Sequence, residues 1–164
     1  MTTAHRTEPT AERTSSSRHL LPEEEFASVV RLIQRDNHGI DEPHAVRIAD
    51  EAIKFVVAAA THPGRLMRPS RAGDMGWHAL LLHTSLYRAL CSSAGRFVDH
   101  YPDEPGTRPV PTQGHRYALD AIRAAGFEPD LSLWPSHHGD CGDCGGCGGG
   151  CGSCGSGGDC GQRP

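Results

Sequence analysis

The sequence predicts an all-α fold, a small four-helix bundle-like domain over residues 20–135. A disordered N-terminal arm (residues 1–19) precedes it, and a low-complexity Gly/Cys-rich tail (residues 136–164) follows it. Two observations lead to this prediction. Apolar residues recur at helical spacing in four segments of the middle region, and no segment alternates apolar and polar residues as a strand does. The chain of 164 residues is long enough for one domain of ordinary size.

The arm and the first helix differ sharply in pattern. Residues 1–19 are polar and show no periodicity, so they cannot bury enough apolar surface to offset the entropy of ordering. The first predicted helix begins at Pro22, followed by three glutamates that suit the positive end of a helix dipole. It ends at Asn37 and Gly39. Its apolar stripe is Phe26, Val29, Val30 and Ile33.

A second helix is predicted from the cap residue Asp41, with Pro43 in its first turn, to the sequence His62-Pro63-Gly64. Its apolar positions are Val46, Ala49, Ile53, Val56, Val57 and Ala60.

The third predicted helix is the longest, running from the cap residue Ser70 to Gly95. The fourth runs from Thr112 to Gly126. The apolar positions of these two helices are Trp77, Leu81, Leu82, Leu86 and Leu90, then Leu119, Ile122 and Ala125.

Charge and hydropathy exclude several classes of function. Sixteen basic and 20 acidic residues give a formal net charge of −4, whereas a general nucleic-acid binder needs a basic surface. No stretch approaches the ~20 apolar residues that span a bilayer. The polar first 19 residues lack the apolar centre of a signal peptide. We therefore expect a cytoplasmic protein that binds neither membranes nor nucleic acids in general.

A motif within the third predicted helix and the residues after it carries a family resemblance. Its residues are Asp74-x-x-Trp77-His78, then Leu82, Thr84, Tyr87, Cys91, Gly95, Phe97 and His100-x-Pro102. With the later stretches 124–127 and 133–135, this pattern resembles the glycine-rich domain-containing proteins and their small actinobacterial and phage relatives. Asp99 stands where many of these relatives have a histidine. The resemblance covers residues 22–135 and implies a fold but no particular reaction.

Asp74, His78 and His100 are the candidate site within the helical domain. Asp74 and His78 are four residues apart and share one helix face, and His100 follows Gly95, where the chain can turn back. Together they offer two or three metal ligands. The packing alternative, which we favour at this stage, makes His78 a helix residue satisfied by Asp74 and Trp77 a core aromatic.

The packing alternative also pairs Tyr87 with Phe97 and buries Cys91 as a small apolar side chain. In a continuous helix, Cys91 lies about 20 Å along the axis from His78 and cannot share a metal with it. A Cys91 nucleophile paired with His100 is a further alternative. His83 lies off the face of His78, and we expect it to be solvated.

The tail contains the strongest metal-ligand pattern. Two-residue spacing between cysteines lets one turn of backbone present two thiolates to a soft ion. No Val, Leu, Ile, Met or aromatic residue is available there for a core. The candidate metal ligands are Cys141, Cys144, Cys147, Cys151, Cys154 and Cys160, with His137 and His138.

Several states of the tail stay open. Zinc or copper(I) bound in a dynamic, metallothionein-like cluster is one, and a thiol tail without metal is another. An iron–sulfur cluster is disfavoured because Gly152 replaces the proline of the ferredoxin motif and no second cysteine set exists. Disulfides need an oxidising compartment, and a further alternative is a precursor whose cysteines an enzyme modifies.

The sequence therefore favours a non-enzymatic bacterial protein that binds zinc or another thiophilic metal ion through its tail. A protein partner is a further expectation. The alternatives are an enzyme that uses Asp74, His78 and His100, and a scaffold or precursor protein.

Overall fold

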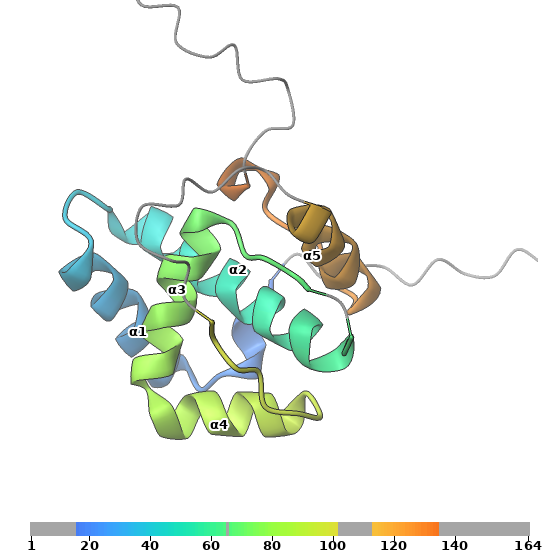
Figure 1. The fold of residues 1–164 in the computed structure, drawn as a ribbon. Helices are drawn as coiled ribbons and strands as arrows, with labels where there is room; N and C mark the ends of the chain where they lie inside the picture. The colour runs from blue at the N-terminus through green and yellow to red at the C-terminus, as the bar shows by residue number, and fades with distance from the viewer. Residues whose placement is uncertain (1–15, 65, 102–112, 135–164) are drawn as a thin grey trace, which may run out of the picture.

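A computed structural model describes residues 16–64, 66–101 and 113–134. In these residues it contains five α-helices, two short 3-10 helices and no strand, so the all-α prediction is confirmed (Figure 1). The elements, in chain order, are η1 (Arg18–Leu20), α1 (Glu23–Asp36), α2 (Glu42–Thr61), α3 (Arg71–Leu82), α4 (Thr84–Ser93), α5 (Gln113–Ala124) and η2 (Leu131–Leu133).

The helix starts follow the predicted capping signals. The side chain of Asp41 accepts a hydrogen bond from the backbone N–H of His44 at 3.0 Å, and Ser70 accepts one from Gly73 at 3.0 Å. Each bond satisfies one of the N–H groups that a first helical turn leaves without a partner. The predicted first, second and fourth helices therefore match α1, α2 and α5 closely, although Thr112 lies outside the described residues.

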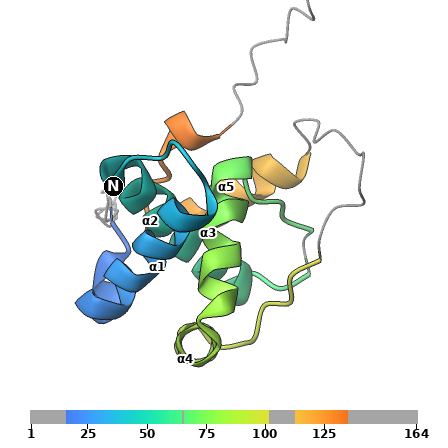
Figure 2. The ribbon, with the colours of Figure 1, turned by 90° about the vertical axis from the view of Figure 1, so that its left-hand side faces the viewer.

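The third predicted helix is instead two helices, α3 and α4, separated at His83. The backbone of His83 leaves the helical region (φ −88°, ψ 63°), and its Nδ1 lies 2.8 Å from the carbonyl oxygen of Ala79. The chain turns there, so α4 runs at a steep angle to α3 (Figure 2). Helical periodicity continues across the break, which is why the sequence pattern gives one helix.

The core forms around α2, which contacts α1, α3, α4 and α5. Its side chains are buried over most of its circumference, including Ile48, Ala52 and Phe55. The Phe55 ring packs on Trp77 of α3 with centroids 5.1 Å apart. Gly76 lets α3 approach α2 closely, because a Cβ added there would lie 2.7 Å from the Ile48 carbonyl oxygen. Figure 1 shows α3 crossing α2.

The predicted boundary of the N-terminal arm is wrong at residues 16–19. Ser17 is fully buried, and its backbone N–H donates to the Asp50 carboxylate of α2 at 2.7 Å. The hydroxyl of Ser16 donates to the same carboxylate at 3.0 Å. Asp50 thus anchors residues that lack any apolar pattern.

Residues 1–15 and the predicted tail lie outside the described residues. None of the described helices is long and apolar enough to cross a bilayer.

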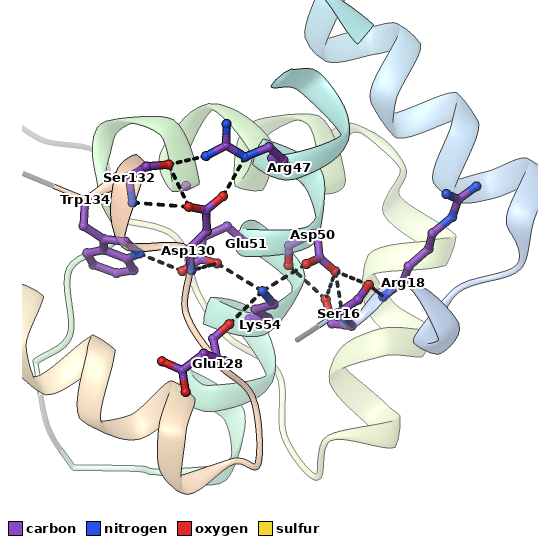
Figure 3. Close-up of polar contacts among 12 residues, drawn as sticks. Ser16, Arg18, Arg47, Asp50, Glu51, Lys54, Glu128, Asp130, Ser132 and Trp134 are labelled. Carbon is purple, nitrogen blue, oxygen red and sulfur yellow. Dashed lines mark hydrogen bonds and ion pairs between the residues drawn. The ribbon is translucent and has the colours of Figure 1, made fainter. Parts of the chain in front are cut away.

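A network of buried charges, which the sequence did not indicate, fixes the C-terminal part of the domain to α2 (Figure 3). Glu51 is fully buried and accepts hydrogen bonds from the Trp134 indole at 2.6 Å and the Asp130 backbone N–H at 3.0 Å. Lys54 lies 3.4 Å from Glu51 and donates to the Glu128 carbonyl oxygen at 2.9 Å. We call Asp50, Glu51 and Lys54 the α2 charge network.

Asp130 makes domain stability depend on pH. Its carboxylate accepts a hydrogen bond from Arg47 at 2.7 Å, and it also binds Ser132 (Figure 3). The Arg47 hydrogen bond is the main cause that lowers the pKa of Asp130 from 3.8 to about 2. A depressed folded-state pKa stabilises the protein above the unfolded-state pKa, and that stabilisation disappears as the pH falls from about 4 to about 2.

We expect urea unfolding at pH 7 and pH 2.5 to show this loss. Because Arg47 is half-exposed, solvent screening limits the effect to about 1 kcal/mol. Asp130→Asn should lower the free energy of unfolding by this amount at pH 7 and by much less at pH 2.5. An equal loss at both pH values would contradict the role assigned to the carboxylate charge.

Candidate functional site

Asp74, His78 and His100 form one cluster, which we call the Asp/His/His cluster. One ligand atom from each lies within 4.8 Å of the others. His100 Nε2 is 3.0 Å from Asp74 Oδ1 and 3.0 Å from His78 Nε2, and His78 Nε2 is 3.8 Å from Asp74 Oδ2. Among the described residues, this is the one group of three or more histidine, cysteine or carboxylate side chains with metal-binding spacing.

Two members of the cluster come from one face of α3. Asp74 lies in the first turn, where a carboxylate favours the positive end of the helix dipole, and His78 follows one turn later. The close packing of Gly76, which lies between them, sets the position of this face relative to α2. The sequence prediction that Asp74 and His78 share a face is confirmed.

The third member comes from the segment after α4. Gly95 turns the chain there with φ 108°, a conformation that suits glycine. The next residue, Arg96, donates to the carbonyl oxygens of Ala59 (2.9 Å) and Ala60 (3.2 Å) at the end of α2. These two hydrogen bonds satisfy carbonyls that a helix end leaves without a partner, and they direct the chain back toward α3.

Buried aromatic contacts then position His100. The Trp77 indole donates to the Tyr87 hydroxyl at 3.0 Å, and that hydroxyl donates to the carbonyl oxygen of Val98. Burial raises the pKa of Tyr87 above its ordinary value, so its hydroxyl remains a donor. The Trp77 ring also packs edge-on against the His100 ring at 4.5 Å. His100 is therefore held in place by core residues.

The protons in the cluster allow at most one linear hydrogen bond among the two short contacts of His100. One hydrogen on His100 Nε2 cannot form linear bonds to both Asp74 and His78, which lie at equal distances from it. Without that hydrogen, its lone pair faces the Asp74 carboxylate. A metal ion would instead accept one lone pair from each residue. One ligand atom from each residue lies within 4.8 Å of the other two, and the two imidazole nitrogens are 3.0 Å apart, near the ~3.3 Å between ligands of a tetrahedral zinc ion.

The cluster opens to solvent on one side. The His78 side chain is 55% exposed and that of Asp74 is 42% exposed, whereas that of His100 is only 11% exposed. Three protein ligands at an open surface leave at least one coordination position for water or another small ligand. This arrangement is typical of exchangeable or catalytic metal sites and differs from closed structural ones.

The structure confirms the core contacts that the packing alternative predicted. Trp77 and Cys91 are buried, and Tyr87 packs on Phe97 with ring centroids 5.4 Å apart, as that alternative predicted. Packing and a three-ligand site thus coexist in this region. The expected solvation of His83 is confirmed only in part, because its side chain is half-buried and its Nε2 lies 3.0 Å from the Ser28 hydroxyl.

The Cys91 thiol is not a member of the Asp/His/His cluster, and its burial removes the exposure that a nucleophile paired with His100 would need. The tail candidates lie outside the described residues. These candidates are His137, His138, Cys141, Cys144, Cys147, Cys151, Cys154 and Cys160.

Fold and site together define a small all-α protein with a partly exposed Asp/His/His cluster on its third helix. Comparison of the chain with protein-family models, curated proteins and solved structures finds no match. The resemblance to glycine-rich domain-containing proteins stays a prediction, and function is argued from the geometry of the site.

Proposed function

We propose that the protein binds a divalent transition-metal ion through Asp74, His78 and His100. The convergence of two imidazole nitrogens and one carboxylate carries this proposal. Two histidines and one carboxylate suit zinc, and the same set with open positions suits ferrous iron. The open side would let a bound ion exchange or contact a small ligand, so the function is reversible metal binding.

The tail requires a separate assay because its six cysteines compete for the same ions. A full-length variant with all six tail cysteines changed to serine and His137 and His138 changed to alanine, which we call the tail-ligand variant, isolates the Asp/His/His cluster. We expect it to bind one equivalent of zinc or cobalt(II) in calorimetry. Cobalt bound by this variant should show visible bands without the thiolate charge-transfer absorption that sulfur ligands produce.

His78→Ala in the tail-ligand variant tests the site with little risk to the fold, since the His78 side chain is more than half exposed. We expect at least a ~100-fold loss of zinc affinity, because loss of a ligand costs at least as much as loss of a residue that supports one. His38→Ala, a change to an exposed histidine between α1 and α2, is the matched control. Unchanged affinity in His78→Ala would refute the proposed site.

A second candidate function is capture of a thiophilic ion, zinc or copper(I), by the tail. The six closely spaced cysteines support it. Metal content after anaerobic purification should then be higher in the wild-type chain than in the tail-ligand variant, which lacks the tail cysteines. Equal content would remove the tail from metal binding and leave the Asp/His/His cluster untouched.

A further inference from the structure

A second polar site lies between α1 and the junction of α3 with α4. The structure has an open groove there of about 500 Å³. It shares no residue with the Asp/His/His cluster. We call it the arginine groove, and its lining residues are Ser28, Arg31, Leu32, Arg35, Leu82 and His83.

The arginine groove is positively charged in a protein whose formal net charge is −4. Arg31 and Arg35 lie one helical turn apart on α1, so their guanidinium groups flank the same opening. Arg31 has no ion-pair partner among the described residues. Arg35 binds the carboxylate of its neighbour Asp36 through Nε (2.6 Å) and Nη2 (3.1 Å), so its Nη1 is the nitrogen left for a ligand. No carboxylate lines the groove itself. Paired guanidinium groups bind carboxylate, phosphate and other oxyanions through two parallel hydrogen bonds.

The break at His83 supplies the polar part of the opposite wall. A carbonyl oxygen only accepts hydrogen bonds, so the 2.8 Å contact with Ala79 places the ring hydrogen on Nδ1. In the neutral ring, Nε2 then accepts the hydroxyl hydrogen of Ser28 at 3.0 Å. These two contacts fix the imidazole orientation and turn the lone pairs of Ser28 away from His83. Ser28 and His83 thus use their hydrogens within the protein, so the hydrogen-bond donors that line the groove for a ligand are those of Arg31 and Arg35.

The groove also exposes an apolar surface. Leu82 is 65% exposed, and the half-buried Leu32 lines the same groove. Leu82 ends α3, so the helix break that positions His83 also leaves this leucine without cover. An apolar wall beside two cations suits a ligand that has both an anionic group and an apolar group.

We propose that the arginine groove binds a small organic oxyanion. The anionic group would lie between Arg31 and Arg35, and the apolar part would contact Leu82 and Leu32. This site is independent of the metal site, so either can fail without the other.

The test is a calorimetric titration of the full-length chain in chelator with phenyl phosphate, benzoate and inorganic phosphate. We expect saturable binding of at least one aryl anion, about tenfold tighter than that of inorganic phosphate. Tighter binding of phenyl phosphate than of benzoate identifies a phosphate ligand, and the reverse order identifies a carboxylate. Lack of saturable binding by both aryl anions would overturn the proposal.

Variants locate the binding. Arg31→Gln combined with Arg35→Gln should weaken aryl-anion binding at least tenfold, because both positive charges are lost. The fold should be retained, because both side chains are exposed. Leu82→Ser should reduce the affinity to that of inorganic phosphate. Arg116→Gln, a change to an exposed arginine on α5, is the matched control and should bind as the wild type does. Equal affinity in the double variant and this control would place the anion elsewhere and refute the assignment.

Discussion

Gly76→Ala is expected to lower the free energy of unfolding by about 3 kcal/mol, the upper part of the range for overpacked cores. The added Cβ would lie 2.7 Å from the Ala52 Cβ and 2.7 Å from the Ile48 carbonyl oxygen. A backbone oxygen cannot move as a side-chain end can, so α3 must shift away from α2. Alanine gains about 1 kcal/mol of helix propensity over glycine, which offsets only part of this cost.

Thermal unfolding followed by circular dichroism measures the effect. A loss of this size lowers the melting temperature by about 10 to 20 °C in a domain of about 100 residues. Gly73→Ala is the matched control, because its Cβ would lie 3.3 Å from the Ser70 hydroxyl oxygen, a side-chain atom. We expect that control to stay within about 1 kcal/mol of wild type. Similar losses at both positions would show that the contact with α2 is not the cause.

The same substitution links the fold to the proposed site. Gly76 lies between Asp74 and His78 on α3, so a shift of α3 moves both ligands relative to the segment of His100, which Arg96 binds to the end of α2. We infer that the absence of a side chain at residue 76 is a condition for the geometry of the Asp/His/His cluster as well as for stability.

Local signals in the sequence account for most of the helices. Asp41 and Ser70 are cap residues whose short side chains bond to the helix start, and Gly95 and Gly126 end helices with positive φ. These effects act within four residues, so the sequence predicts them. The break at His83 involves a contact with Ser28 on another helix, 55 residues away, which no local pattern contains.

The sequence predicts only part of the candidate site. The spacing of Asp74 and His78 places them on one face, and Gly95 permits the return of the chain. The arrival of His100 at that face depends on Arg96 reaching α2 and on the hydrogen bond from Trp77 to Tyr87. These contacts join distant parts of the chain, so spacing alone left His100 as a candidate without a fixed partner.

The α2 charge network was missed for a different reason. Asp50, Glu51 and Lys54 occupy a helix that is otherwise rich in Ala, Val and Ile, and charged side chains on a helix are usually solvated. Opposite charges three and four residues apart can pair inside a core, but the same spacing is common on solvated helix faces and this helix has further polar residues, so the pattern alone did not indicate burial. Their partners, Ser17 and Trp134, come from the two ends of the described domain.

Lys54→Met is expected to lower the free energy of unfolding by about 3 to 5 kcal/mol, the cost of leaving buried charges without their counter-charge. Lys54 Nζ lies 3.0 Å from Asp50 Oδ2 and 3.4 Å from Glu51 Oε2. Its removal leaves two adjacent carboxylates, one of them fully buried, with no cation beside them. Methionine fills a similar volume, so the loss reports charge and hydrogen bonding more than a cavity. Urea unfolding at pH 7 measures it.

The matched control is Arg35→Met, which removes a cation from the exposed pair with Asp36 and should leave the midpoint of unfolding unchanged. A second comparison separates pairing from burial. Glu51→Gln in the Lys54→Met background removes one of the two unpaired carboxylates, and we expect it to recover part of the lost stability. The amide oxygen can still accept from the Trp134 indole, but the amide NH2 then faces the Asp130 N–H, so the recovery is partial. If Lys54→Met were as stable as the control, the buried lysine would not be the counter-charge that holds Asp50 and Glu51 in the core.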